Sequence, residues 1–374
     1  MAMPNPFPKL RGTDTCFLLL IAFILLASVN EFTATTNARF GRSTANSRVH
    51  STRSELTPQA PIDPQVKLVH DKMYADGIGR PATVADVRKA YLFYPKLSGA
   101  PEHVFRVENR DIPGPAGNLA IRVYIPNSGA RLPVFVFFHG GGFVAGSLDS
   151  HDTALRSVTN RCECIVVSVA YRLAPKNKYP AATQDAYAAT KWVAEHANDI
   201  GGDSSRIALG GDGAGGNLAA VVTLMAREHG TPRLTFQVLI YPMLDASTMR
   251  PSWFTDTDAP TVTRESKHSM LSAYLPIAVN LGDPYISPIR ADNLTDLPPA
   301  LVIVYGGDDP TRGEGEDYAH RLTHDGVAAR ISIYPETIHG FFLMAGELDA
   351  GKKCIDETAS TLKNALVGSL RLAQ

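Results

Sequence analysis

The 374-residue sequence has only four cysteines, almost no net charge and no apolar run of the roughly 20 residues that span a bilayer as a helix. The cysteines are Cys16, Cys162, Cys164 and Cys354. So small a number argues against a framework of several disulfides, although a single bond to Cys354 stays open in an oxidising compartment. Cys162 and Cys164 have no companion His or Cys cluster. We therefore expect no zinc site and interpret both as small, buried apolar residues.

The charge balance excludes some classes of partner. The chain carries 36 Lys and Arg against 37 Asp and Glu, a formal net charge of −1, and no long block of basic residues. A nucleic acid or another strongly charged partner is therefore not expected. The composition, with 44% apolar and 20% charged residues, is typical of a folded protein with a large core.

One apolar run lies close to the N-terminus. Lys9 and Arg11 precede "CFLLLIAFILLASV", residues 16–29, whose 14 residues are too few for a membrane-spanning helix. A basic flank before a short apolar segment is typical of a secretory signal peptide. We predict a signal over residues 1–29 and a secreted or periplasmic protein; the alternative is an uncleaved signal that tethers the chain to a membrane. Residues 30–60 are rich in Ser, Thr, Asn and Arg, which predicts a flexible linker.

Residues 61–374 have the pattern of a globular α/β domain. The stretches "PIDPQVKLVHDKMYAD" and "TVADVRKAYLFYPKL" show the apolar spacing of helices, so we expect an N-terminal helical cap at 61–100. Strand-like and helix-like segments then alternate, which predicts a mostly parallel central sheet with helices on both faces. The irregular stretch at about 246–283 is expected to be a second cap element or a wall of the site. Some aromatic residues of these two stretches either line a pocket or form the core of the cap: Tyr74, Tyr91, Phe93, Tyr94, Trp253 and Phe254.

A glycine-rich turn joins a strand-like run, "RIALG", to a helix-like run, "NLAAVVTLMAREHG". This is the setting of a nucleophile elbow, whose pattern is Gly-x-Ser-x-Gly. Here the five residues are Gly211, Asp212, Gly213, Ala214 and Gly215, so the central hydroxyl is lacking. The alternative is a phosphate-cradling loop at a helix N-terminus. Neither a Gly-Lys-Ser/Thr ending nor the spacing of a dinucleotide-binding loop is present, which argues against that alternative.

A second glycine-rich segment, His139 to Gly142, directly follows the apolar run "PVFVFF". Consecutive glycines let backbone N–H groups approach a ligand closely. Two such donors can stabilise the oxyanion of a tetrahedral acyl-transfer intermediate, and the N–H of Ala214 would be a third. The alternative interpretation is a plain glycine-rich turn.

An acid and a histidine follow two later strand-like runs. Asp309 comes after "ALVIVYGGD" and His339 after "ARISIYPETI". The order of elbow, acid and histidine is that of a hydrolase triad, in which the acid orients the imidazole and the imidazole accepts the nucleophile's proton. All of these segments end strand-like runs, where open α/β sheets bind their ligands. We therefore interpret Asp309 and His339 as triad members.

Taken in order, these segments resemble the hormone-sensitive-lipase-like family of α/β-hydrolase esterases, from about Pro61 to the C-terminus. The blocks that carry the resemblance are "FFHGGGFVAGSLDSHD", "VSVAYRLAPKNKYPAA", "GGDGAGGNLAA", "DDPTRGEGEDYAHRL" and "IHGF". The resemblance implies an α/β-hydrolase fold and a carboxylesterase or lipase that acts on small to medium acyl esters without a cofactor or metal. It implies the following roles: Asp309 as triad acid, His339 as base, Gly141, Gly142 and Ala214 as oxyanion donors with Gly140 in the same loop, and Glu314 at an acidic position shortly after the triad acid.

The sequence departs from that family at Gly213, where the family has serine. Without the hydroxyl no acyl-enzyme can form at this position, and Asp212 is expected to point elsewhere because neighbouring side chains on so tight a turn diverge. Two interpretations stay open: a carboxylic-ester hydrolase that is weak or inactive as written, and a non-catalytic binder of a small ester or carboxylic acid. A lyase or transferase without a covalent step is a third. Nothing in the sequence decides the oligomeric state.

Overall fold

A computed structural model describes residues 63–129, 131–248, 261–305 and 311–367 of the chain. The predicted signal and linker, Trp253, Phe254 and the predicted triad acid Asp309 lie outside the described residues. Within those ranges no helix combines the length and the apolar character needed to cross a membrane.

The described residues form one eight-stranded sheet, in the order β1-β2-β4-β3-β5-β6-β7-β8. β1 and β2 form an antiparallel pair, β2 is also antiparallel to β4, and the strands from β4 to β8 pair in parallel. The mostly parallel sheet expected from the alternation is therefore confirmed. The strands are β1 (Arg106–Gly114), β2 (Gly117–Ile125), β3 (Leu132–Phe138), β4 (Ile165–Val169), β5 (Gly202–Asp212), β6 (Phe236–Ile240), β7 (Ala300–Tyr305) and β8 (Ala329–Tyr334).

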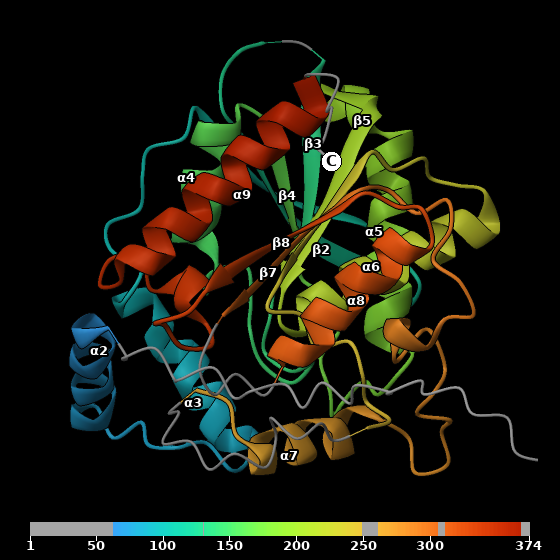
Figure 1. Ribbon diagram of the computed structural model, residues 1–374. Helices are drawn as coiled ribbons and strands as arrows, with labels where there is room; N and C mark the ends of the chain where they lie inside the picture. The colour runs from blue at the N-terminus through green and yellow to red at the C-terminus, as the bar shows by residue number, and fades with distance from the viewer. Residues whose placement is uncertain (1–62, 130, 249–260, 306–310, 368–374) are drawn as a thin grey trace, which may run out of the picture. The chain divides into compact units, whose positions relative to one another are not determined.

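Helices cover both faces of this sheet (Figure 1). α4 and α9 pack together on one face, and α5, α6 and α8 lie on the other. These helices are α4 (Asp152–Cys162), α5 (Ala181–Glu195), α6 (Ala214–His229), α8 (Arg312–His324) and α9 (Asp349–Val367).

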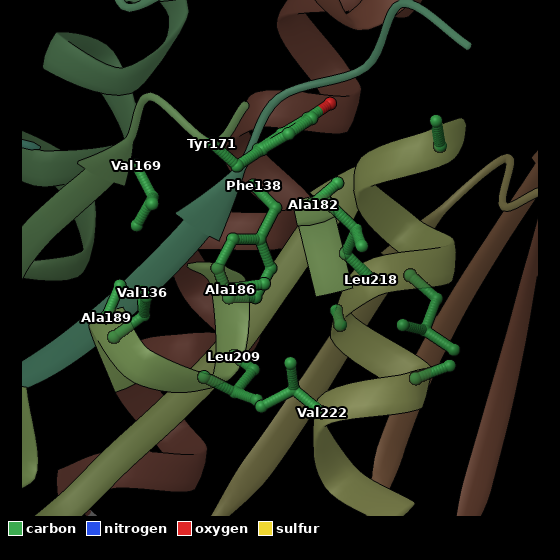
Figure 2. Packing of buried hydrophobic residues seen from close by; sticks show 14 of the residues in the cluster. Val136, Phe138, Val169, Tyr171, Ala182, Ala186, Ala189, Leu209, Leu218 and Val222 are labelled. Carbon is green, nitrogen blue, oxygen red and sulfur yellow. The ribbon is translucent and has the colours of Figure 1, made fainter. Parts of the chain in front are cut away.

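β3 shows why the central strands read as continuous apolar runs. Phe135 and Phe137 belong to the core on the side of α4 and α9, whereas Val136 and Phe138 belong to the core on the side of α5 and α6. Figure 2 shows Val136 and Phe138 packed with Leu218 and other residues of that second core. Because side chains alternate between the faces of a strand, a strand buried on both faces needs apolar residues at every position.

Three further helices lie beside the sheet: α2 (Pro64–Ala75), α3 (Val84–Phe93) and α7 (Arg264–Tyr274). α2 and α3 occupy the two stretches predicted to be helical. The α3 N-terminus is closed by a capping box between Thr83 and Asp86, which satisfies backbone N–H groups that a helix start leaves unpaired. α7 lies within the stretch expected to be irregular, and a capping box between Thr263 and Ser266 starts it. The division into domain and cap elements stays a prediction.

The structure corrects our interpretation of the cysteines. Cys162 and Cys164 form a disulfide with each other, and Cys354 is buried as a free thiol. Both bonded residues are buried, as expected, but they are not simple apolar residues. Glu163 between them has a positive φ of 54°, which ends α4 and brings the flanking Cα atoms to 5.2 Å, within the range a disulfide requires.

Candidate functional site

Gly213 lies in the tight turn between β5 and α6. Its backbone angles are φ 54° and ψ −113°, a conformation that costs a residue with a side chain on the order of 1–3 kcal/mol. Its N–H donates to the carbonyl of Ile240 at 2.9 Å, and its own carbonyl accepts from the N–H groups of Asn217 and Met243 at 3.2 and 3.1 Å. Three backbone hydrogen bonds therefore fix the turn, and the conformation is one that glycine adopts without strain.

The glycine that follows this turn lets α6 pack directly on β3. A Cβ atom at Gly215 would lie 1.8 Å from the carbonyl oxygen of Phe138. No side chain can occupy that space, so glycine is required for this close packing. The turn is consequently pressed against the end of the strand that leads into the His139–Gly142 segment.

His339 lies after β8 and is directed at the turn. A Cβ atom at Gly213 would lie 3.5 Å from Nε2 of His339 and 4.0 Å from Cε1. The imidazole ring packs against Tyr241, with ring centroids 4.6 Å apart, and only 9% of the residue is exposed. A hydroxyl attached to that Cβ would therefore lie within hydrogen-bonding reach of Nε2.

The environment of His339 keeps its imidazole neutral. Burial lowers the pKa of His339 to about 4, against an opposing effect of the Asp212 charge. At pH 7 the ring is therefore unprotonated and able to accept a proton. Nδ1 is buried and has no hydrogen-bond partner within the part of the chain that the structure describes. Asp309, the predicted partner, lies outside that part, so its role stays a prediction.

The His139–Gly142 segment follows β3 and faces the same pocket as the turn. Gly141, Gly142, Gly213, Ala214 and His339 all line this pocket. The structure therefore brings the predicted oxyanion donors and the predicted base together at the carboxyl ends of the strands.

Gly140 has a different role from the other glycines of this loop. The N–H of Gly140 donates to Oδ1 of Asp212 at 2.7 Å, so it is not available to an oxyanion. Gly140 instead ties the loop to β5, because Asp212 is the last residue of that strand. As expected, Asp212 does not replace the missing hydroxyl, since its carboxylate points into the loop.

Sequence reasoning missed the partner of this carboxylate. Nε2 of His151 lies 2.9 Å from the same Oδ1 of Asp212, and both residues are at most 1% exposed. Burial opposes ionisation of Asp212, but the His151 charge and its hydrogen bond, together with the Gly140 N–H, lower the pKa of Asp212. The ionised carboxylate of Asp212 therefore holds the His139–Gly142 segment in place through the N–H of Gly140. His151 lies within the block "GSLDSHD", but nothing in that block indicates its partner.

The pocket holds about 500 Å³ of empty space, part of which is open to solvent. Tyr91 and Tyr94 of the predicted N-terminal cap line it, whereas Phe93 belongs to the core and Tyr74 is exposed. Met270 of α7 lies against the glycine loop, since a Cβ atom at Gly142 would fall 1.9 Å from its Sδ. The remaining lining residues are Val87, Met243, Thr261, Val262, Lys267 and Thr311.

A buried ion pair connects α7 to the base of the pocket. Nζ of Lys267 lies 2.7 Å from Oε1 of Glu314, and both side chains are at most 1% exposed. The other carboxylate oxygen of Glu314 accepts the N–H groups of Leu244 and Asp245 at 2.7 and 2.9 Å. Glu314, the acidic position noted in the sequence, thus pairs with Lys267. Among the residues the structure describes, no group of three His, Cys, Asp or Glu residues could hold a metal ion.

Ser204 and Ser205 lie within the first residues of β5, at the end opposite to Gly213, so neither supplies a hydroxyl to the turn.

The chain is similar in sequence and in structure to known esterases. The sequence pattern of a family described as alpha/beta hydrolase fold matches residues 135–343. Esterase LipI of Mycobacterium tuberculosis (strain ATCC 25618 / H37Rv) is 39% identical over 287 residues, which cover 75% of this chain and 88% of that protein. Carboxylesterase NlhH of Mycobacterium tuberculosis (strain CDC 1551 / Oshkosh) is 38% identical over 320 residues, which cover 82% and 96%. The solved structure of a hyperthermophilic esterase from the archaeon Pyrobaculum calidifontis matches with a TM-score of 0.76 at 39% identity and covers 82% of this chain and 99% of that one.

Proposed function

We propose that this chain, which belongs to the alpha/beta hydrolase fold family, is a carboxylic-ester hydrolase for small to medium acyl esters whose activity is weak because Gly213 stands at the nucleophile position. Relatives that match most of its length are named as an esterase and a carboxylesterase. The parts of the pocket other than position 213 have the residue types that this chemistry needs.

One observation carries the proposal. The Cβ position at Gly213 lies 3.5 Å from Nε2 of His339, and Gly141, Gly142 and Ala214 line the same pocket. A serine hydroxyl at this position would give its proton to Nε2 and attack the acyl carbon. The backbone N–H groups of the glycine loop and of Ala214 would then stabilise the oxyanion.

In the chain as written no acyl-enzyme forms at position 213. Substrate binding and an oxyanion hole can still leave a rate about 10³–10⁴-fold above that in water when the nucleophile is removed. We expect such residual hydrolysis to proceed by a water molecule for which His339 acts as general base. The rate should therefore fall further when His339 is replaced by alanine.

The test compares hydrolysis of p-nitrophenyl acetate by the full chain, by Gly213→Ser and by Gly213→Ala. The serine variant should gain orders of magnitude in kcat/KM, and the alanine variant should gain nothing, because it adds the Cβ atom without the hydroxyl. Adding His339→Ala to the serine variant should abolish the gain. A folded serine variant no faster than the alanine variant would refute the proposal.

The alternative function is a non-catalytic binder of a small ester or carboxylic acid. It is favoured by the combination of a formed pocket, an ionised support beneath the glycine loop and the absence of a hydroxyl at Gly213. Calorimetric titration with short-chain carboxylic acids distinguishes the two functions. Micromolar binding together with no gain from Gly213→Ser would favour the binder.

We also propose that the chain is exported, with residues 1–29 acting as the signal. The support is the basic flank and the 14-residue apolar run of the sequence. N-terminal sequencing of the protein after expression in a secreting host tests this. A new N-terminus after the apolar run supports a cleaved signal, and an intact, membrane-bound N-terminus supports the anchor.

A further inference from the structure

The space beside Gly213 is the only room for a side-chain-sized group among the three glycines of the turn. A Cβ atom at Gly211 would lie 2.3 Å from the backbone of Gly215, and one at Gly215 would lie 1.8 Å from that of Phe138. At Gly213 the nearest atoms are Nε2 and Cε1 of His339, at 3.5 and 4.0 Å, which is ordinary van der Waals contact. This room also opens into the pocket.

The room is bounded by the backbone of Gly213 and the ring of His339. The hydrogen bonds of Gly213 to Ile240, Asn217 and Met243 fix the backbone on one side. Packing against Tyr241 fixes the His339 ring on the other. In the structure these contacts leave the room beside Gly213 unfilled.

The chemistry of Gly213 and His339 determines which kind of ligand fits beside them. Glycine presents only a CH₂ group, and His339 presents a neutral nitrogen whose pKa is lowered by burial. A molecule that lies beside them in the pocket needs one hydroxyl that donates to Nε2 and no charge. Tyr91, Tyr94 and Met243 make the nearby pocket largely apolar, which favours a hydroxyl with a short carbon chain over a more polar molecule.

We propose that this site binds a small primary alcohol in the pocket beside Gly213, with its hydroxyl on His339, and transfers an acyl group from an ester directly to that alcohol. The proposal rests on the proposed function, because it uses the same ester pocket and the same oxyanion donors. It differs in its chemistry, since one displacement replaces the two steps of a serine hydrolase and the second product is an ester instead of an acid.

The step balances within the site. The alcohol proton passes to Nε2 of His339, the alcohol oxygen forms a bond to the acyl carbon, and the carbonyl oxygen takes the negative charge. The N–H groups of Gly141, Gly142 and Ala214 are the donors for that oxyanion. The adduct then collapses, the bond to the original alkoxy oxygen breaks, and the proton on His339 returns to the leaving oxygen. No oxidant, reductant or covalent enzyme intermediate is involved.

The experiment measures release of p-nitrophenol from p-nitrophenyl acetate by the full chain in increasing methanol, with methyl acetate determined by gas chromatography. We expect release to rise at least about ten-fold by molar methanol, a small part of the roughly 10²–10⁴-fold that a positioned general base supplies. Methyl acetate should form in step with p-nitrophenol. tert-Butanol at the same concentration should have little effect, because the three methyl groups on its hydroxyl-bearing carbon hinder attack on the acyl carbon.

Gly213→Ala is the matched control, since its methyl group fills the room and leaves every other wall in place. It should lose the methanol response, as should His339→Ala. Circular dichroism confirms that each variant is folded. A parent chain whose response to methanol equals that of Gly213→Ala, or equals its response to tert-butanol, overturns the inference.

The Gly213→Ser variant distinguishes a failure of the alcohol site from a failure of the proposed hydrolase function. If the serine variant hydrolyses the ester but the parent chain ignores methanol, only the alcohol site is refuted. If the serine variant is also inactive, the hydrolase pocket itself is refuted. In an active serine variant methanol should change the ratio of products through an acyl-enzyme, which a direct transfer does not use.

Discussion

Replacing Gly213 should reveal how much stability the turn loses when it carries a side chain. At φ 54° and ψ −113° a non-glycine residue is strained by about 1–3 kcal/mol. Replacing glycine also reduces the conformational entropy of the unfolded chain, which stabilises the folded state by about 0.4–1 kcal/mol. Among the residues that the structure describes, a Cβ atom here meets no closer neighbour than His339 at 3.5 Å, so steric overlap adds little. Gly213→Ala should therefore lower the free energy of unfolding by about 1–2 kcal/mol.

Gly213→Ser should lose less than the alanine variant. Its hydroxyl can bond to Nε2 of His339, and a hydrogen bond of this kind contributes about 0.5–1.5 kcal/mol. The expected order of stability is glycine, then serine, then alanine. A family member that keeps serine here accepts this strain for the sake of the reaction, which is the usual conflict between stability and activity.

Urea unfolding followed by circular dichroism at pH 7 measures these differences, and equal m-values are required for the comparison. Gly230→Ala is the control, because Gly230 has φ 68° at the end of α6 and no atom within 4 Å of its Cβ position. It should show the cost of positive φ away from the pocket. A Gly213→Ala variant as stable as the parent would refute the argument from strain.

Two further predictions concern the buried charges. In the Gly213→Ser background, Asp212→Asn should lower kcat at least about ten-fold with little change in KM, since it weakens the support of the His139–Gly142 segment without touching substrate. The control is Asp203→Asn, at the other end of β5, which should have no effect. Equal losses in the two variants would contradict the supporting role of Asp212. The pKa values of His139 and His339 are lowered to about 4, mainly by burial, so the folded chain binds fewer protons than the unfolded chain between pH 6.5 and 4. Stability should therefore be full above pH 6.5 and fall as the pH is lowered, by about 2 kcal/mol for each histidine at pH 5. Urea unfolding at pH 7 and pH 5 checks this, and equal free energies would show that the histidines are not buried as neutral rings.

Much of the fold could be predicted because local pattern and tertiary role agree. The run Val134–Phe138 has no polar residue, and the structure buries it on both faces of the sheet. The strand-turn-helix setting of Gly213 also follows from sequence, since the glycines next to it permit only close backbone packing. The approach of His339 to Gly213 could be predicted from their positions after parallel strands.

The contacts between distant segments could not be predicted. Asp212 and His151 are 61 residues apart, and nothing local indicates that one carboxylate serves both His151 and the N–H of Gly140. The disulfide of Cys162 depends on a left-handed residue that composition does not reveal. Side chains that pair across the fold carry no periodic signal, so their partners appear only when the chain is folded.

The sheet order gives the segments that carry Gly213 and His339 unequal local stability. Gly213 follows β5, which is flanked by β3 and β6, whereas His339 follows β8, which forms one edge of the sheet and is half exposed. Edge segments open to solvent at lower free energy than central strands, as amide hydrogen exchange reports. A fluctuation that releases β8 therefore separates the imidazole from the turn while the central strands stay paired. The pair can come apart, and re-form, without the protein unfolding.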